Sequence, residues 1–99
     1  KNKQWRLTPA YDVAYCYQPN NAWVERHWMP ANGKRINHNR EDLIAVGRNM
    51  TKLAVPELHE SIDRVIESVS TWNTLAKEHE VPSVLRKAIA GNLPLGDFK

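Results

Sequence analysis

The spacing of apolar residues changes near residue 38 of the chain. Before it, apolar residues alternate with polar ones or stand beside prolines, which is typical of strands and turns. After it they recur every three or four residues, which is typical of amphipathic helices. We therefore predict a strand and hairpin region at 1–37 and a helical part at 38–99. The expected fold is α+β and mostly helical: a short β-hairpin region followed by a small three-helix bundle.

The first strand signal is the sequence KQWRL at residues 3–7. Trp5 and Leu7 alternate there with polar residues, which predicts a half-buried strand. Thr8 and Pro9 follow directly, and a proline has no N–H to donate to a strand ladder. We expect the strand to end at this point.

A hairpin is predicted around Asn32 and Gly33. This dipeptide favours a type I′ turn because both central residues of that turn need a positive φ. We expect short strands on either side, over residues 27–31 and 34–37. Pro30 restricts the first of them to the edge of a sheet or interrupts it.

Three helices are predicted in the second region. The first follows Asn39, which can cap it together with Asp42 three residues later. The second starts at Pro56 and runs for about six turns on one apolar stripe. The third follows the sequence EVPS and ends near Gly91, and the tail 92–99 reads as irregular. The stripe of the second helix consists of Leu58, Ile62, Val65, Ile66, Val69, Trp72 and Ala76.

Composition narrows the class of protein. The 99 residues allow one domain, and 41% hydrophobic with 25% charged residues is ordinary for a globular chain. Basic and acidic residues are interspersed at a net charge of +3, so we do not expect direct binding of nucleic acid. No apolar run reaches membrane-spanning length, and the single Cys16 cannot form an internal disulfide. A cytoplasmic location without membrane contact is the expectation.

Candidate chemistry centres on Asp12, a lone carboxylate between apolar neighbours with Arg6 as its nearest basic residue. A charge in such surroundings is costly unless it is exposed, paired or bound to a metal. Asp12 is either an ordinary turn aspartate or a ligand that holds Mg²⁺ on nucleotide phosphates. The histidines lack metal-site spacing, and no catalytic triad or glycine-rich phosphate loop is visible, so we predict no catalytic residue.

A second interpretation concerns the sequence LAKEHEVPSVLRKAIAG at residues 75–91. Two helices joined by a short turn, with Arg86 and Lys87 on the second, resemble a DNA-binding helix-turn-helix. Glu80 stands where such motifs usually carry a glycine, and its charge opposes DNA binding. Packing within a helical bundle is the simpler explanation. A small DNA-binding or protein-interaction module is therefore the alternative function.

Two stretches, WRLTPAYDVAY and NGKRINHNREDLIAVG, resemble the C-terminal part of HipA-like serine/threonine kinases, the toxins of bacterial toxin–antitoxin pairs. The sequence STWNTLAKEHEVP also looks like a segment of that family. The resemblance covers nearly the whole chain, and its most specific parts are residues 9–12 and 32–43. From this resemblance we expect the chain to have the fold and the function of part of a kinase C-lobe.

The resemblance implies a role for Asp12. In these kinases the Asp of Pro-x-Tyr-Asp coordinates the metal on ATP, as the Asp of an Asp-Phe-Gly motif does in other kinases. Val13 and Ala14 replace the Phe and Gly here, as is usual in the family. The family's catalytic base, ATP-clamping lysine and phosphate loop lie upstream of the matching region. We therefore expect Mg²⁺ and ATP only in a full-length kinase, and no activity or cofactor for this chain alone.

The resemblance also implies partners. The first would be the N-terminal remainder of the kinase, with this chain as a C-terminal piece of it. The second would be the antitoxin, which in this family is commonly a small DNA-binding protein. The helical part at 38–99 would offer the scaffold of the C-lobe and a surface for that antitoxin.

Overall fold

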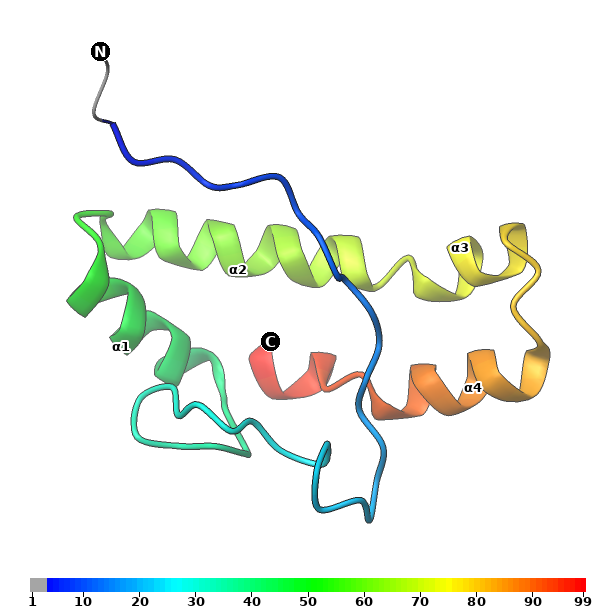
Figure 1. Ribbon diagram of the computed structural model, residues 1–99. Helices are drawn as coiled ribbons and strands as arrows, with labels where there is room; N and C mark the ends of the chain where they lie inside the picture. The colour runs from blue at the N-terminus through cyan, green and yellow to red at the C-terminus, as the bar shows by residue number, and fades with distance from the viewer. Residues whose placement is uncertain (1–3) are drawn as a thin grey trace.

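A computed structural model describes residues 4–99 and shows a small helical protein (Figure 1). Its helices are α1 (Arg40–Met50), α2 (Val55–Val69), α3 (Trp72–Glu78), α4 (Ser83–Asn92) and a final 3₁₀ helix, η1 (Leu95–Phe98). No strand forms in the described range, where the β-structure is a single isolated bridge. The mostly helical character was predicted correctly, whereas the β-hairpin region of the expected α+β fold was not.

Residues 5–17 of the N-terminal segment are extended, with a bend at Asp12, and none of them belongs to a strand. Figure 1 shows it as a long trace that crosses the helices before the chain loops back to α1. The strand predicted at residues 3–7 is therefore wrong for residues 4–7, and Lys3 lies outside the described residues. An isolated strand cannot satisfy its own backbone groups, and no neighbouring strand is present in the described part of the chain.

The turn at Asn32 and Gly33 forms as predicted. Their φ angles are 50° and 73°, and the bridge between Ala31 and Lys34 closes the turn. Its two backbone hydrogen bonds are 2.9 and 3.0 Å long. The positive φ angles that Asn and Gly tolerate are thus realised at this turn, as the sequence predicted.

The strands expected at 27–31 and 34–37 do not form around that turn. The next backbone bond joins the His27 amide to the Arg35 carbonyl at 2.9 Å. A regular two-residue hairpin would instead place His27 opposite His38, so the two arms have lost register. Pro30 has no N–H to donate to a strand ladder, and it lies in the arm at residues 27–31 that departs from regular pairing.

The start of α1 matches the predicted capping box. The Asn39 side chain accepts from the Asp42 amide at 3.0 Å, and the Asp42 carboxylate accepts from the Asn39 amide at 2.9 Å. Two of the amides that a helix N-terminus leaves unbonded are thereby satisfied. The second helix also begins close to the expected residue, with Pro56 in its first turn.

The long helix predicted from Pro56 to Ala76 is interrupted. α2 ends at Val69, and α3 begins at Trp72. The hydroxyls of Ser70 and Thr71 donate to the carbonyls of Ile66 and Ser68, at 2.6 and 2.7 Å. Such bonds compete with the helical backbone pattern, so the apolar stripe continues while the helix breaks. The bundle consequently has four α-helices in the described range where three were expected.

The C-terminal elements also differ from the prediction. α4 continues through Gly91 to Asn92, one residue past the expected stop. The tail then forms η1, where an irregular segment was expected. This short helix packs on α2 and returns the C-terminus to the middle of the molecule (Figure 1).

The core is small. Within residues 4–99 its buried apolar side chains are Leu58, Ala76 and Ile89. α1 and α2 approach closely at Gly47, where an added Cβ would lie 2.7 Å from Leu58 Cδ2. The radius of gyration is 16.0 Å, against about 13 Å for a typical domain of this length. Much apolar surface is therefore left exposed by the helices and by the N-terminal segment.

Candidate functional site

Asp12, the predicted metal ligand, lies at a bend in the extended N-terminal segment. Its side chain is exposed, and its φ of 55° is in the left-handed region that Asp tolerates better than most residues. Because the Asp12 carboxylate is exposed to solvent, its charge carries no desolvation cost despite the apolar neighbours in the sequence. Proteins commonly bind Mg²⁺ through one or two carboxylates, and phosphates and water supply the other ligands. One free carboxylate is therefore enough for a protein to contribute to such a site.

Within residues 4–99 the structure does not gather a set of metal-ligating side chains around Asp12. Among residues 4–99 no group of three or more His, Cys, Asp or Glu side chains is placed to hold a metal ion. Asp12 and Asp42, the two aspartates in the regions of strongest family resemblance, belong to separate surroundings, one exposed and one buried. Asp12 could thus contribute one ligand, and the remainder of a site would have to come from elsewhere.

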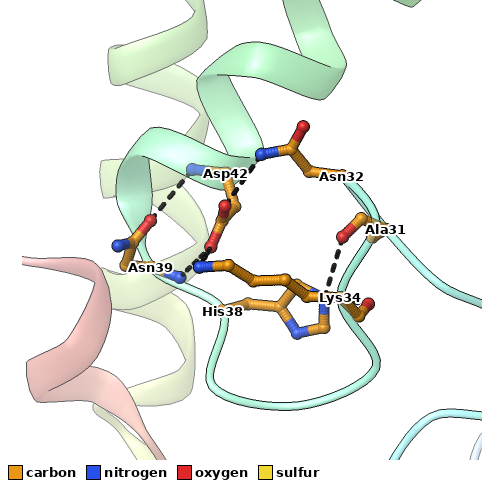
Figure 2. Close-up of polar contacts among 6 residues, drawn as sticks. All are labelled: Ala31, Asn32, Lys34, His38, Asn39 and Asp42. Atoms are coloured by element: carbon orange, nitrogen blue, oxygen red, sulfur yellow. Dashed lines mark hydrogen bonds and ion pairs between the residues drawn. The ribbon is translucent and has the colours of Figure 1, made fainter.

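The best-connected polar group is the carboxylate of Asp42, shown in Figure 2. It is buried, with 4% of its surface exposed, at the start of α1. Oδ1 accepts from Asn32 Nδ2 at 2.8 Å, and Oδ2 accepts from Lys34 Nζ at 2.8 Å and from the Asn39 amide. Each donor comes from the turn or the helix cap, so one carboxylate joins the Asn32–Gly33 turn to α1.

The electrostatics of Asp42 follow from these bonds. The hydrogen bonds from Lys34, Asn32 and the Asn39 amide lower the pKa of the carboxyl from 3.8 to about 2. Partial burial acts in the opposite direction but is outweighed. Both oxygens are engaged, and the group stays ionised in neutral solution. Asp42 is therefore suited to hold the structure together and poorly suited to exchange protons or bind a metal.

His38 completes this cluster from below the turn (Figure 2). Its Nε2 lies 2.8 Å from the Lys34 carbonyl and 3.2 Å from the Ala31 carbonyl. Both partners are acceptors, so Nε2 carries the hydrogen and donates to them. The ring of His27 meets that of His38 edge-on at 5.6 Å. His38 therefore has a structural role at the turn.

Aromatic and cationic side chains gather near residues 23–35. The rings of Trp23 and Trp28 are 6.0 Å apart, and the Arg35 guanidinium lies 4.8 Å from the centre of the Trp28 ring. Arg35 Nε donates to the His27 carbonyl at 2.8 Å, while its buried Nη2 has no partner within residues 4–99. These side chains line a hollow of about 670 Å³ that also reaches the α4–η1 junction. Trp23 is 76% exposed and Trp28 is 60% exposed.

A second cluster fastens η1 to the helices. Arg40 Nε donates to the Phe98 carbonyl at 2.7 Å, and Nη1 donates to His59 Nδ1 at 3.0 Å. Its Nη2 forms an ion pair with Asp63. Beside it is an apolar hollow of about 450 Å³ between α1, α2 and η1. Sequence periodicity gives no signal for the Arg40–Phe98 contact, which joins residues 58 positions apart.

The predicted phosphate contacts of the alternative function lie on α4. Lys87 is exposed, and Arg86 is half-buried, with its carbonyl accepting from Trp72 Nε1 at 3.1 Å. The chain reverses between α3 and α4 through Glu80, whose φ is 58°. This is the backbone conformation for which a glycine would be favoured. The two cations therefore belong to a packed helix pair, with Ala76 buried on the α3 side.

Comparison of the chain with models of protein families, with curated proteins and with solved structures finds no match. Within residues 4–99 no helix combines the length and the apolar character that crossing a membrane requires.

Proposed function

We propose that this chain is the C-terminal part of a HipA-like serine/threonine kinase. The whole enzyme would transfer the γ-phosphoryl group of ATP to a Ser or Thr hydroxyl of a protein. A new O–P bond forms at that hydroxyl while the bond to the leaving ADP oxygen breaks. The proton of the hydroxyl goes to a base that the family carries upstream of the matching region. When bound, Mg²⁺ would neutralise the charge on the phosphates.

The observation that carries this proposal is the position of Asp12 within the Pro-Ala-Tyr-Asp motif. The resemblance makes it a metal ligand, and the exposed carboxylate at a bend is sterically free to act as one. Asp42, in the other resembling stretch, is fully engaged by Asn32, Lys34 and Asn39. Of these two carboxylates, Asp12 is the one that is free for a cation.

The extended shape and the small core give further support. A scaffold that packs against the rest of an enzyme exposes apolar side chains when it is taken alone. Large exposed apolar residues in the N-terminal region include Trp5, Leu7, Tyr11, Val13, Trp23, Trp28 and Met29. We propose that the remainder of the kinase covers part of this surface. A small DNA-binding antitoxin is the second proposed partner, on the helical part at 40–99.

The test is Asp12→Asn in the full-length kinase that the proposal requires. Mg²⁺-dependent ATP binding and phosphorylation of the protein substrate should fall by about 100-fold or more, because the lost charge contributes several kcal/mol. Asp97→Asn, at another exposed aspartate, is the matched control and should leave both unchanged. Undiminished activity in the Asp12 variant would refute the assignment, as would kinase turnover by the 99-residue chain alone.

A second candidate is DNA binding by α3 and α4, whose connecting turn has at Glu80 the positive φ that a glycine often supplies in a helix-turn-helix. It would use Arg86 and Lys87 against phosphates, so binding would weaken steeply with salt. Replacing both residues with alanine should abolish binding if this candidate is right. No salt-dependent retention of duplex DNA by the unaltered chain would exclude it.

A further inference from the structure

The N-terminal segment at residues 5–17 has the pattern of a β-strand without the partner of one. Every odd position carries an apolar or aromatic side chain or a proline, so one face of the segment is apolar. Trp5 is 100% exposed, Leu7 96% and Val13 83%. The apolar face consists of Trp5, Leu7, Pro9, Tyr11, Val13, Tyr15 and Tyr17.

The backbone of this segment is equally unpartnered. Within the described residues, none of the amides or carbonyls of residues 5–17 forms a backbone hydrogen bond. Figure 1 shows the segment as a free trace crossing the helices. An extended apolar segment with open backbone groups is a template for another strand.

We propose that the segment pairs antiparallel with the same segment of a second copy of this chain, centred on Pro9. In that register Trp5 faces Val13 of the second copy and Leu7 faces its Tyr11. By the two-fold symmetry each of these contacts occurs twice. The pairing joins aromatic to aliphatic side chains on one continuous apolar face, which favours cross-strand association.

Pro9 decides which positions carry the hydrogen bonds. On the two-fold axis it can occupy a non-hydrogen-bonded pair, where the amide points away from the partner strand. Its missing N–H then costs nothing. The odd positions all become non-hydrogen-bonded pairs, in which facing side chains lie closest together. The even positions carry the backbone bonds, starting with Thr8 and Ala10.

Charge selects the same register. With Pro9 on the axis, Arg6 lies opposite Asp12 of the second copy, and Asp12 opposite its Arg6. These are the two charged residues between residues 5 and 17. A shift of the register by two residues would separate them and leave each facing an uncharged residue. The lone carboxylate among apolar neighbours thereby acquires a basic partner.

Pairing changes the backbone at Asp12, whose φ of 55° must become extended. The left-handed conformation is the less favourable one for a non-glycine residue, so this change is not opposed. In the paired dimer the Asp12 carboxylate faces an arginine. In the proposed kinase the same carboxylate would bind a metal ion. The pairing is therefore a property of the 99-residue chain on its own and does not depend on the kinase proposal.

The first test measures association of the purified chain by sedimentation equilibrium. The unaltered chain should form dimers as its concentration rises. Asp12→Arg and Arg6→Asp should each raise the dimer dissociation constant by about tenfold or more, because two attractive pairs become repulsive. An equimolar mixture of the two variants should form heterodimers again, since every facing pair is then of opposite charge. Lys77→Glu, a charge reversal at an exposed residue of α3, is the matched control and should leave the constant unchanged.

The second test reads the register. In a Cys16→Ser background, Pro9→Cys should form an intermolecular disulfide rapidly under mild oxidation, because residue 9 faces itself across the axis. Thr8→Cys should react much more slowly, since residue 8 faces residue 10. A chain that stays monomeric up to about 1 mM would overturn the inference. So would association that ignores the charge reversals, or equal disulfide yields at the two positions. None of these outcomes alters the full-length test of Asp12.

Discussion

The helices at 40–99 and the segment at 5–17 both have periodic apolar residues, but only the helical pattern produces secondary structure. In α2 the apolar residues recur at helical spacing, and the helix forms because its backbone bonds are made within the same 15 residues. At residues 5–17 every odd position carries an apolar or aromatic side chain or a proline, yet no strand forms in the described chain. A strand needs hydrogen-bond partners from another segment. Periodicity therefore predicts a helix by itself, and predicts a strand only together with a partner.

Asp42 joins the two regions. Through Asn32 and Lys34 it fixes the turn of the first region to the first helix of the second. The turn itself is local in origin, like the helices. The two regions differ because a strand in the first would need hydrogen-bond partners from a distant segment, whereas the helices do not. Mutations that disturb one region and leave the other intact can test this difference.

The largest effect is expected from Leu58→Ala in α2. Leu58 is buried against α1 at Gly47, and its truncation leaves a cavity between the two helices. The free energy of unfolding of the helical part should fall by about 2–4 kcal/mol, measured by urea denaturation with circular dichroism at 222 nm. Val84→Ala on α4 is the control, because Val84 is 81% exposed and should contribute less than about 0.5 kcal/mol. Equal effects of the two variants would show that α1 and α2 do not share a core.

The same distinction explains how far the sequence predicted the structure. The Asn39 capping box and the Asn32–Gly33 turn depend on neighbours within a few residues, and both were predicted correctly. The break at Ser70 was missed, because the apolar stripe continues across it while two hydroxyls bond back to the helix. For the strands expected on either side of the turn, the sequence pattern indicated that the two arms can pair. It could not reveal that the arms lose register.

The candidate site divides in the same way. Asp12 was selected from the sequence by its lone charge and by the family resemblance, and its role as a metal ligand stays a prediction. Asp42 was expected only to cap α1. Its bonds to Lys34 and Asn32, eight and ten residues away, have no periodic signature. One local signal could have suggested these bonds. It is the Asn-Gly-Lys turn that precedes the Asn-x-x-Asp cap by a few residues.

A smaller effect is expected from protonating Asp42. Its pKa is about 2 in the folded chain and 3.8 for the ordinary carboxyl. The contribution of the carboxylate to stability is therefore complete above about pH 4 and is lost as the pH falls through about 2. Between about pH 5 and pH 2 the unaltered chain should lose its stability advantage over Asp42→Asn, measured by thermal unfolding of both. An advantage that is constant over this range would contradict the proposed link. Glu60→Gln, at an exposed carboxylate on α2, should show no such convergence.

The smallest effect is expected from replacing Trp5 and Leu7 together with serine. Both side chains are almost fully exposed, so they leave little apolar contact to lose within one copy of the chain. At concentrations where the chain is monomeric, the free energy of unfolding of the helices should change by less than about 0.5 kcal/mol. The same double variant should abolish dimers at high concentration, because both residues lie on the proposed pairing face. A loss of more than about 1 kcal/mol in the monomer would show that the segment already packs on the helices, and the contrast between the two regions would fail.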